Sequence, residues 1–168
     1  MNLIEAPVTG RTPTASSAVI DYATEERLRF DVLTHEPTAS ALAEAKATGQ
    51  PQHRVAKTVV LHDGAAYVFA VVPASHRVDL RKVRSILGAS GSLRLATEAE
   101  MRRDFPALEI GAFPPVGPAL TAAELIDVRV TRNERVLCAA GDLRHSLLLD
   151  PLEIVRVTDA TVADICED

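Results

Sequence analysis

The sequence contains no tryptophan, and aromatic residues make up only 4% of the chain. Proteins that hold single-stranded nucleic acid commonly stack its bases on aromatic side chains, so this scarcity excludes such a platform as the main design. Hydrophobic residues still account for 47% of the 168 residues, and most of them are alanine, valine or leucine. A chain of this length can bury a substantial core, and we expect that core to be aliphatic.

Cysteine and histidine are also sparse. The two cysteines, Cys138 and Cys166, form no C-x-x-C pair, which excludes a disulfide framework and favours buried thiols. The five histidines show no metal-ligand spacing; they are His35, His53, His62, His76 and His145. The motifs G-x-S-x-G, H-E-x-x-H and G-K-[ST] are missing too. We therefore expect no metal, no cofactor and no nucleophilic hydrolase of a familiar type.

Long hydrophobic runs are absent as well. No apolar run is long enough to cross a bilayer, and the N-terminus lacks the charged start and apolar middle of a secretion signal. We expect a cytoplasmic protein with no membrane partner.

The net charge of −5 is unevenly distributed. Residues 77–103 contain seven basic and three acidic side chains, so this segment carries +4 and the remainder carries −9. The basic residues are Arg77, Arg81, Lys82, Arg84, Arg94, Arg102 and Arg103. A basic region on an acidic body is suited to approach a polyanion, although a solvated helix face shows the same pattern.

Hydrophobic periodicity predicts a mixed α/β fold in one domain. Residues 1–17 show no periodicity, so we expect a flexible segment, docked at most around Leu3 and Ile4, before a single domain of residues 18–168. Helices are predicted at 18–28, 38–49 and 79–88, and further helices begin near 97 and 151. Strands are predicted at 30–35, 55–61, 66–73, 92–96, 125–130, 135–139 and 147–149.

Two local signals are specific. Asp63-Gly64 between two β-branched runs indicates a hairpin. The helix predicted after residue 79 has one apolar face, and its spacing places Arg77, Arg81 and Arg84 on a common outer face.

The stretch EIGAFPPVGPAL, Glu109–Leu120, sets two glycines around adjacent prolines, and we call it the proline loop. Proline lacks the N–H that a helix interior or a central strand needs, so this segment is predicted to be a rigid loop. Such a loop is either a connection between two sheet elements or a pocket wall that presents backbone N–H groups to a ligand.

Lys57 lies in the strand sequence VAKTVVL, whose other residues are nearly all apolar. Burying an unpaired ammonium is unfavourable by several kcal/mol. The side chain therefore either extends to solvent at the strand end or points at an anionic group.

Four segments in this order resemble the YbaK-type aminoacyl-tRNA deacylase family: HEPTASALAEA, VAKTVVL, AYVFAVVPASHRVDLRKVRSILG and EIGAFPPVG. That family also occurs as an editing domain inserted in bacterial prolyl-tRNA synthetases. The resemblance covers residues 35–150 and implies a mixed α/β fold around a strongly bent sheet flanked by helices. It also implies an enzyme that hydrolyses the ester joining a wrong amino acid to tRNA. Mischarged tRNA and an aminoacyl-tRNA synthetase are the implied partners.

The resemblance also implies site residues. The strand lysine of the family matches Lys57, which would bind the terminal phosphate or hold a pocket carbonyl in place. The family's G-x-x-x-P loop matches residues 111–115, so the amides of Gly111, Ala112 and Phe113 would stabilise the oxyanion. The further substrate-binding candidates are His35, Pro114, Pro115, Gly117 and His145. The candidates for contact with the tRNA backbone are Arg77, Arg81, Lys82 and Arg84.

Other readings of the sequence stay open. Water is the expected nucleophile, oriented by the pocket or by the terminal ribose hydroxyl of the substrate. Pro114 stands where many relatives of the family carry a small or polar residue, so the sequence does not identify the amino acid. An inactive tRNA- or synthetase-binding module of the same fold is one alternative. A binder of small molecules or peptides is another.

Overall fold

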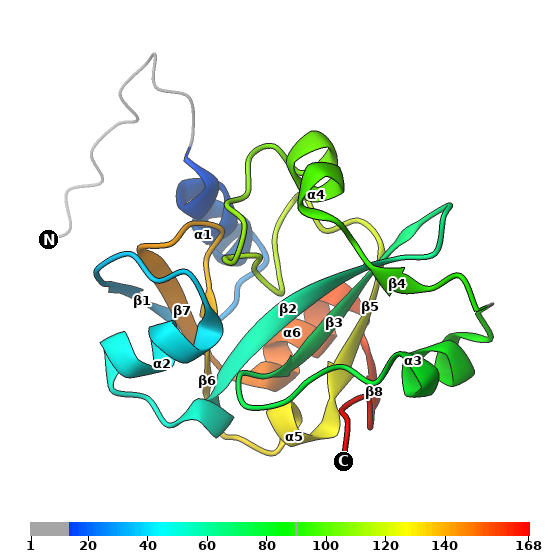
Figure 1. Ribbon diagram of the computed structural model, residues 1–168. Helices are drawn as coiled ribbons and strands as arrows, with labels where there is room; N and C mark the ends of the chain where they lie inside the picture. Colours follow the sequence, from blue (N-terminus) through cyan, green and yellow to red (C-terminus); the bar gives the residue numbers. More distant parts are fainter. Residues whose placement is uncertain (1–13, 90) are drawn as a thin grey trace, which may run out of the picture.

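Eight strands form one mixed sheet in the computed structural model, which describes residues 14–89 and 91–168 (Figure 1). They are β1 (Phe30–Thr34), β2 (Val55–His62), β3 (Tyr67–Pro73), β4 (Arg94–Leu95), β5 (Ala123–Asp127), β6 (Val136–Ala139), β7 (His145–Leu149) and β8 (Thr161–Ala163). Their order across the sheet is β1-β7-β6-β2-β3-β5-β8, and β4 pairs with β2. The predicted mixed α/β class is confirmed.

Six α-helices and one 3-10 helix of the described residues surround the sheet. They are α1 (Ala15–Glu25), α2 (Ala41–Thr48), η1 (Gln52–Arg54), α3 (Leu80–Leu87), α4 (Glu98–Asp104), α5 (Val128–Thr131) and α6 (Pro151–Thr158). Helix α1 begins inside the segment predicted to be flexible, because Thr14 caps it by accepting the Ser17 N–H. Leu3 and Ile4 lie outside the described residues. None of the helices in the described ranges combines the length and hydrophobicity needed to cross a membrane.

Side-chain caps move two element boundaries away from their predicted positions. Helix α2 is capped by Ser40, whose hydroxyl accepts the Ala43 N–H, and it therefore starts after residue 40 rather than after residue 38. The strand predicted at 125–130 ends at Asp127, because that carboxylate accepts the Arg129 N–H and starts α5. Both corrections come from oxygen atoms that satisfy free amides at a helix start.

The outer edge of β2 is paired only at its two ends. Strand β6 pairs with Val55 and Ala56, and β4 pairs with Leu61 and His62. The edge between them, residues 57–60, faces no other strand of the described residues. A space is thereby left in the middle of the sheet, between β6 and β4.

Successive side chains of β2 alternate between the two faces of the sheet. Val60 packs into an aromatic cluster that includes Phe113, whereas Leu61 packs into the cluster on the α3 side. The alternation therefore puts Thr58 on the face of the proline loop and Lys57 on the face of α3.

Candidate functional site

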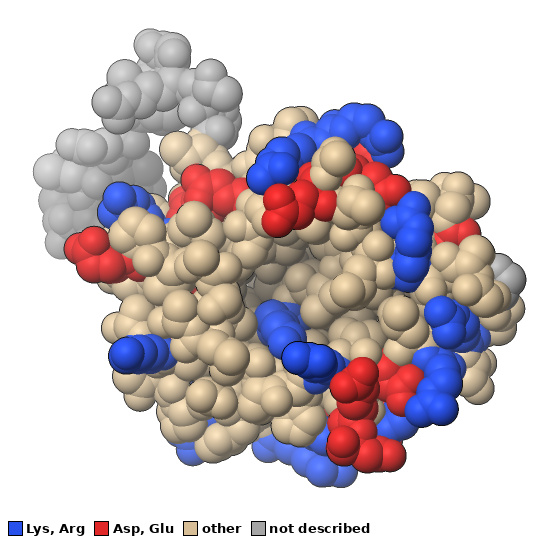
Figure 2. All heavy atoms as spheres, in the orientation of Figure 1, with Lys and Arg blue, Asp and Glu red and all other residues tan. Residues whose placement is uncertain are grey.

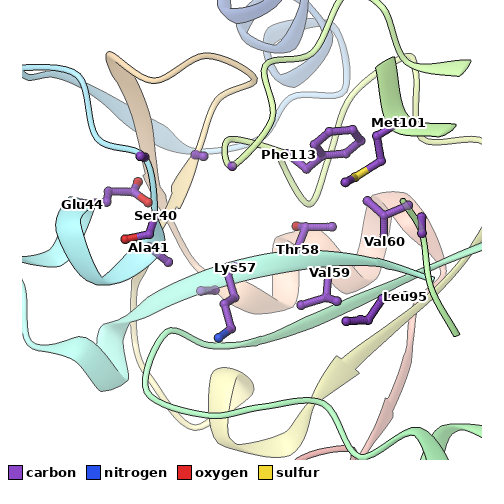
Figure 3. A pocket seen from close by; sticks show the side chains of 15 residues that line it. Ser40, Ala41, Glu44, Lys57, Thr58, Val59, Val60, Leu95, Met101 and Phe113 are labelled. Carbon is purple, nitrogen blue, oxygen red and sulfur yellow. The ribbon is translucent and has the colours of Figure 1, made fainter. Parts of the chain in front are cut away.

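A cavity of about 330 Å³ opens at the unpaired edge of β2, and we call it the first cavity. It is lined by Ala39, Ser40, Ala41, Glu44, Ala56, Lys57, Thr58, Val59, Val60, Leu95, Ala96, Met101, Gly111, Phe113 and Ala139. The end beside α2 is polar, with Ser40 and Glu44, and the end beside Met101 and Phe113 is apolar (Figure 3). This size and mixed lining are typical of a site for a small molecule.

The proline loop contributes Gly111 and Phe113 to the wall of the first cavity. Gly111 has φ +89°, and a Cβ placed on it would lie 2.7 Å from the carbonyl oxygen of Ala39. Only glycine allows the loop to approach the start of α2 so closely. The N–H groups of Gly111 and Phe113 donate no hydrogen bond to another described residue, whereas that of Ala112 donates to the Glu109 carbonyl at 3.1 Å. Two of the three predicted donors are therefore not engaged by the described residues.

The second half of the proline loop anchors it in the core. Pro114, Pro115 and Gly117 are buried and do not line the first cavity. A Cβ placed on Gly117 would lie 3.4 Å from a methyl group of Val19 in α1. The loop is therefore a pocket wall in its first half and a packed connection in its second. Substrate contact by its prolines stays a prediction.

Lys57 lines the same cavity from β2, on the side opposite Phe113 (Figure 3). Its Nζ donates to the Ala74 carbonyl at 3.4 Å, which is a long hydrogen bond. Within the described ranges, no carboxylate forms an ion pair with it. Burial lowers the pKa of this ammonium. A half-buried cation without a counter-charge is suited to bind an anionic group of a ligand.

A second cavity of about 520 Å³ adjoins the first and shares Lys57, Val59 and Leu95 with it. Arg77 and Arg81 line this second cavity. Figure 2 shows that this face of the molecule is hollowed near its centre, with basic side chains along the lower rim of the hollow. A chain of phosphates that left the first cavity past Lys57 would meet both arginines.

Three of the four predicted tRNA contacts have a partner inside the protein, and one of them, Arg81, pairs with Asp79 at 3.7 Å although its side chain is 88% exposed. Lys82 forms ion pairs with two carboxylates of the C-terminal segment, each at 3.1 Å. Arg84 donates to the Leu93 carbonyl at 2.8 Å. Arg77 lies before the start of α3, so it is not part of a face of that helix. The predicted outer face of three arginines is therefore wrong. Contact of Arg77, Arg81, Lys82 and Arg84 with tRNA stays a prediction, and of these Arg77 and Arg81 line the second cavity.

His145 lies outside both cavities. Its Nδ1 lies 2.9 Å from each carboxylate oxygen of Asp142, and the same carboxylate accepts the N–H groups of Arg144 and His145. These bonds hold the turn before β7. Contact between His145 and a substrate stays a prediction.

His35 is connected to the first cavity through Ser146. Its Nε2 lies 2.7 Å from the Ser146 hydroxyl, which donates to Oε1 of Glu44 at 2.5 Å. Its Nδ1 lies 2.8 Å from the carbonyl of Glu36. Glu44 lines the first cavity although it is only 4% exposed. Burial raises the pKa of this carboxyl, while the Ser146 hydrogen bond and the charge of His35 oppose that rise.

The sequence did not single out Ser40, Glu44 or Thr58, which are polar residues of the first cavity. Glu44 resembles any acid that stabilises the first turn of a helix, and only its place beside Ala45 on the buried side of α2 distinguishes it. Thr58 is a β-branched residue of a kind that is common in strands, so its sequence position alone does not mark it as a site residue. Its hydroxyl is buried, lines the first cavity and has no hydrogen-bond partner among the described residues.

Gly111→Ala is expected to destabilise the protein more than the same change at Gly64. Both glycines have left-handed φ angles, +89° and +95°, which are unfavourable for alanine by about 1–2 kcal/mol. Only at Gly111 would the new methyl also meet a backbone oxygen, which adds about 1–3 kcal/mol, since no atom lies within 4 Å at Gly64. Urea unfolding measures both changes. Equal losses in the free energy of unfolding at the two positions would show that a methyl group at residue 111 is accommodated beside Ala39.

Comparisons with known proteins bear on this site. The sequence profile of the aminoacyl-tRNA editing domain matches residues 35–157. A solved structure described as a candidate trans-editing enzyme for prolyl tRNA synthetase is similar at 26% identity, with a TM-score of 0.79 over 95% of this chain and 100% of that chain. The hypothetical protein APE2540 shares 24% identity, with a TM-score of 0.81 over 89% and 99%, and thus the same fold. No curated protein matches the chain.

Proposed function

The chain belongs to the aminoacyl-tRNA editing domain family, and from this premise we propose that it hydrolyses the ester bond of mischarged aminoacyl-tRNA and releases a small amino acid. The observation that carries this proposal is the single cavity lined by Lys57, Gly111 and Phe113. The similarity to a candidate trans-editing enzyme supports a prolyl-tRNA synthetase as the partner whose errors are removed.

Ester hydrolysis needs a nucleophile and donors for the oxyanion. The oxygen of a water adds to the ester carbonyl carbon, the bond from that carbon to the ribose oxygen breaks, and the ribose oxygen takes up a proton. The unengaged amides of Gly111 and Phe113 are the donors that the wall offers to the developing charge. No histidine lines the first cavity to activate the Ser40 or the Thr58 hydroxyl, and no cysteine lines it, so the proposed nucleophile is water held by the neighbouring ribose hydroxyl.

Lys57 binds the terminal phosphate of the tRNA. Its position supports this role, because it is shared by the first cavity and the second. The aminoacyl group occupies the first cavity, and the nucleotides leading to it cross Lys57 into the second cavity. Arg77 and Arg81 then lie along the path of the backbone.

The size of the first cavity supports a small amino acid as the product. Its apolar end, beside Met101 and Phe113, receives the side chain. An apolar pocket separates substrates that differ by one methylene by about 1–3 kcal/mol. Small changes in this lining would therefore set the preference among alanine, cysteine, serine and threonine.

A deacylation panel tests the proposed function. Purified protein is incubated with tRNAs charged with alanine, cysteine, serine or threonine, and the free amino acid is measured against the rate in buffer. We expect release of at least one of these amino acids well above that rate. Salt-sensitive tRNA binding with no release would instead identify an inactive binding module.

Arg77→Gln and Arg81→Gln are each expected to weaken tRNA binding and to reduce its salt dependence. Loss of one phosphate contact lowers the slope of log K against log salt by about 0.7–0.9. Binding titrations between about 50 and 200 mM salt measure that slope. Arg132→Gln is the matched control, because Arg132 lines a different surface pocket. Wild-type slopes in both test variants would show that the tRNA does not cross the second cavity.

A further inference from the structure

The first cavity is lined by one carboxylate, Glu44, and one ammonium, Lys57. Glu44 lies on α2 at the polar end, and Lys57 lies on β2 where the second cavity begins (Figure 3). The end of an aminoacyl-tRNA carries the opposite pair of charges, an α-ammonium on the amino acid and a phosphate beyond the ribose. We propose that Glu44 binds the α-ammonium and thereby selects esters of amino acids over esters of other acids. This inference rests on the proposed function.

One oxygen of Glu44 is free to make this contact. Oε1 accepts the Ser146 hydroxyl, whereas Oε2 has no hydrogen bond to any described residue. Because Glu44 is only 4% exposed, water solvates this oxygen poorly. A charge-assisted hydrogen bond formed there is correspondingly strong.

His35 and Ser146 hold the Glu44 carboxyl in place and oppose the rise of its pKa that burial causes. Nδ1 of His35 faces the Glu36 carbonyl, which can only accept, so Nδ1 carries a hydrogen. The Ser146 hydroxyl donates to Oε1 of Glu44 and lies 2.7 Å from Nε2 of His35. The Ser146 hydroxyl thereby links the imidazole of His35 to the Glu44 carboxyl. The network fixes Oε1 and leaves Oε2 for the ligand.

No other side chain that lines the first cavity can offer an ammonium a negative charge. The Ser40 hydroxyl already accepts the Ala43 N–H, and the remaining polar side chains of the cavity are Lys57 and Thr58. An ester of an α-hydroxy acid has the same shape as the aminoacyl ester but no charge. It would leave the Glu44 carboxylate buried without its partner, which is unfavourable.

Binding of two non-hydrolysable probes tests the inference independently of catalysis. The probes are 3′-alanylamino-3′-deoxyadenosine and its 3′-lactylamino counterpart, which differ by an ammonium in place of a hydroxyl. We expect the wild-type protein to bind the alanyl probe about 10- to 100-fold more tightly. Glu44→Gln should reduce this preference to about twofold or less without weakening the lactyl probe. Glu36→Gln is the matched control and should keep the preference, because its side chain is exposed and only its carbonyl contacts His35.

The outcomes separate the inference from the proposed function. Equal affinity of the wild-type protein for the two probes overturns the inference, and this comparison does not depend on how well Glu44→Gln folds. A Glu44→Gln variant that keeps the preference, or that loses both probes equally, also overturns it. A wild-type preference for the alanyl probe, abolished in Glu44→Gln, supports the inference. If the deacylation panel then shows no release, hydrolysis fails while recognition of the ammonium stands.

Discussion

Lys57→Ala is expected to abolish release of the amino acid from mischarged tRNA while the protein stays folded. Lys57 lines both cavities, and under the proposed function its loss would leave the terminal phosphate without a partner. Removing one positioned electrostatic group from an active site lowers the rate by about 100- to 1000-fold. Single-turnover deacylation measures this loss.

The folded state should tolerate the change at Lys57. Burial lowers the pKa of this ammonium, which means that folding disfavours its charged form. The side chain contributes one long hydrogen bond, to the Ala74 carbonyl at 3.4 Å. We therefore expect the free energy of unfolding at neutral pH to stay the same or to rise slightly.

Two further substitutions sharpen the experiment at Lys57. Lys57→Met keeps most of the length of the side chain without its charge and should be as inactive as Lys57→Ala. Lys46→Ala removes an exposed lysine of α2 that lines neither cavity and should leave the rate unchanged. Full activity in Lys57→Ala would contradict the role given to the ammonium.

The fold was predictable where short-range chemistry determines it. Asp63-Gly64 forms the turn between β2 and β3, and Thr97 and Glu100 form the reciprocal cap of α4. The start of α1 was placed three residues too late, because Thr14 was not recognised as its cap. Strand β8 was missed because its three residues are too few for a pattern and it is held by parallel pairing with β5.

The candidate site was predictable only in part. Lys57 and the proline loop carry unusual residues within one short segment each, so the sequence reveals them. Glu44 becomes distinctive only when Ser146, 102 residues away in the sequence, donates to it. The first cavity itself results from the gap between β6 and β4 along β2, which depends on pairing between distant strands. Arg84 was misplaced because a contact with the Leu93 carbonyl cannot be read from helical spacing.

Glu124→Gln is expected to stabilise the protein increasingly as the pH rises from about 4.5 to about 8. Glu124 lies in β5 opposite Phe69 of β3 and is only 6% exposed. Its Oε1 has no hydrogen-bond partner among the described residues. Burial raises the pKa of this carboxyl from 4.5 to about 8. The folded protein therefore holds Glu124 protonated at a pH where the unfolded chain ionises it.

The sign and size of the effect follow from these two pKa values. Below pH 4.5 the carboxyl is protonated in both states, so wild type and variant should have similar stability. As the pH rises from 4.5 to about 8, the unfolded wild-type chain releases a proton that the folded protein retains, and wild-type stability falls. At about 1.4 kcal/mol for each pKa unit, the loss reaches at most about 5 kcal/mol. Glutamine has no such proton, so the variant should not show this loss.

Urea unfolding of both proteins at intervals across this pH range measures the difference. Glu134→Gln is the matched control, because Glu134 is exposed and the change there should leave the pH dependence of the wild type in place.

The result for Glu124→Gln also bears on the candidate site. Glu124 shares its face of β5 with Ile126, which belongs to the same core cluster as Val19 of α1. Val19 lies against the proline loop at Gly117. Ionisation of Glu124 above pH 8 would therefore loosen the packing behind the cavity wall. A stability difference that is constant with pH would show that Glu124 ionises with nearly the same pKa in both states, and this coupling would not exist.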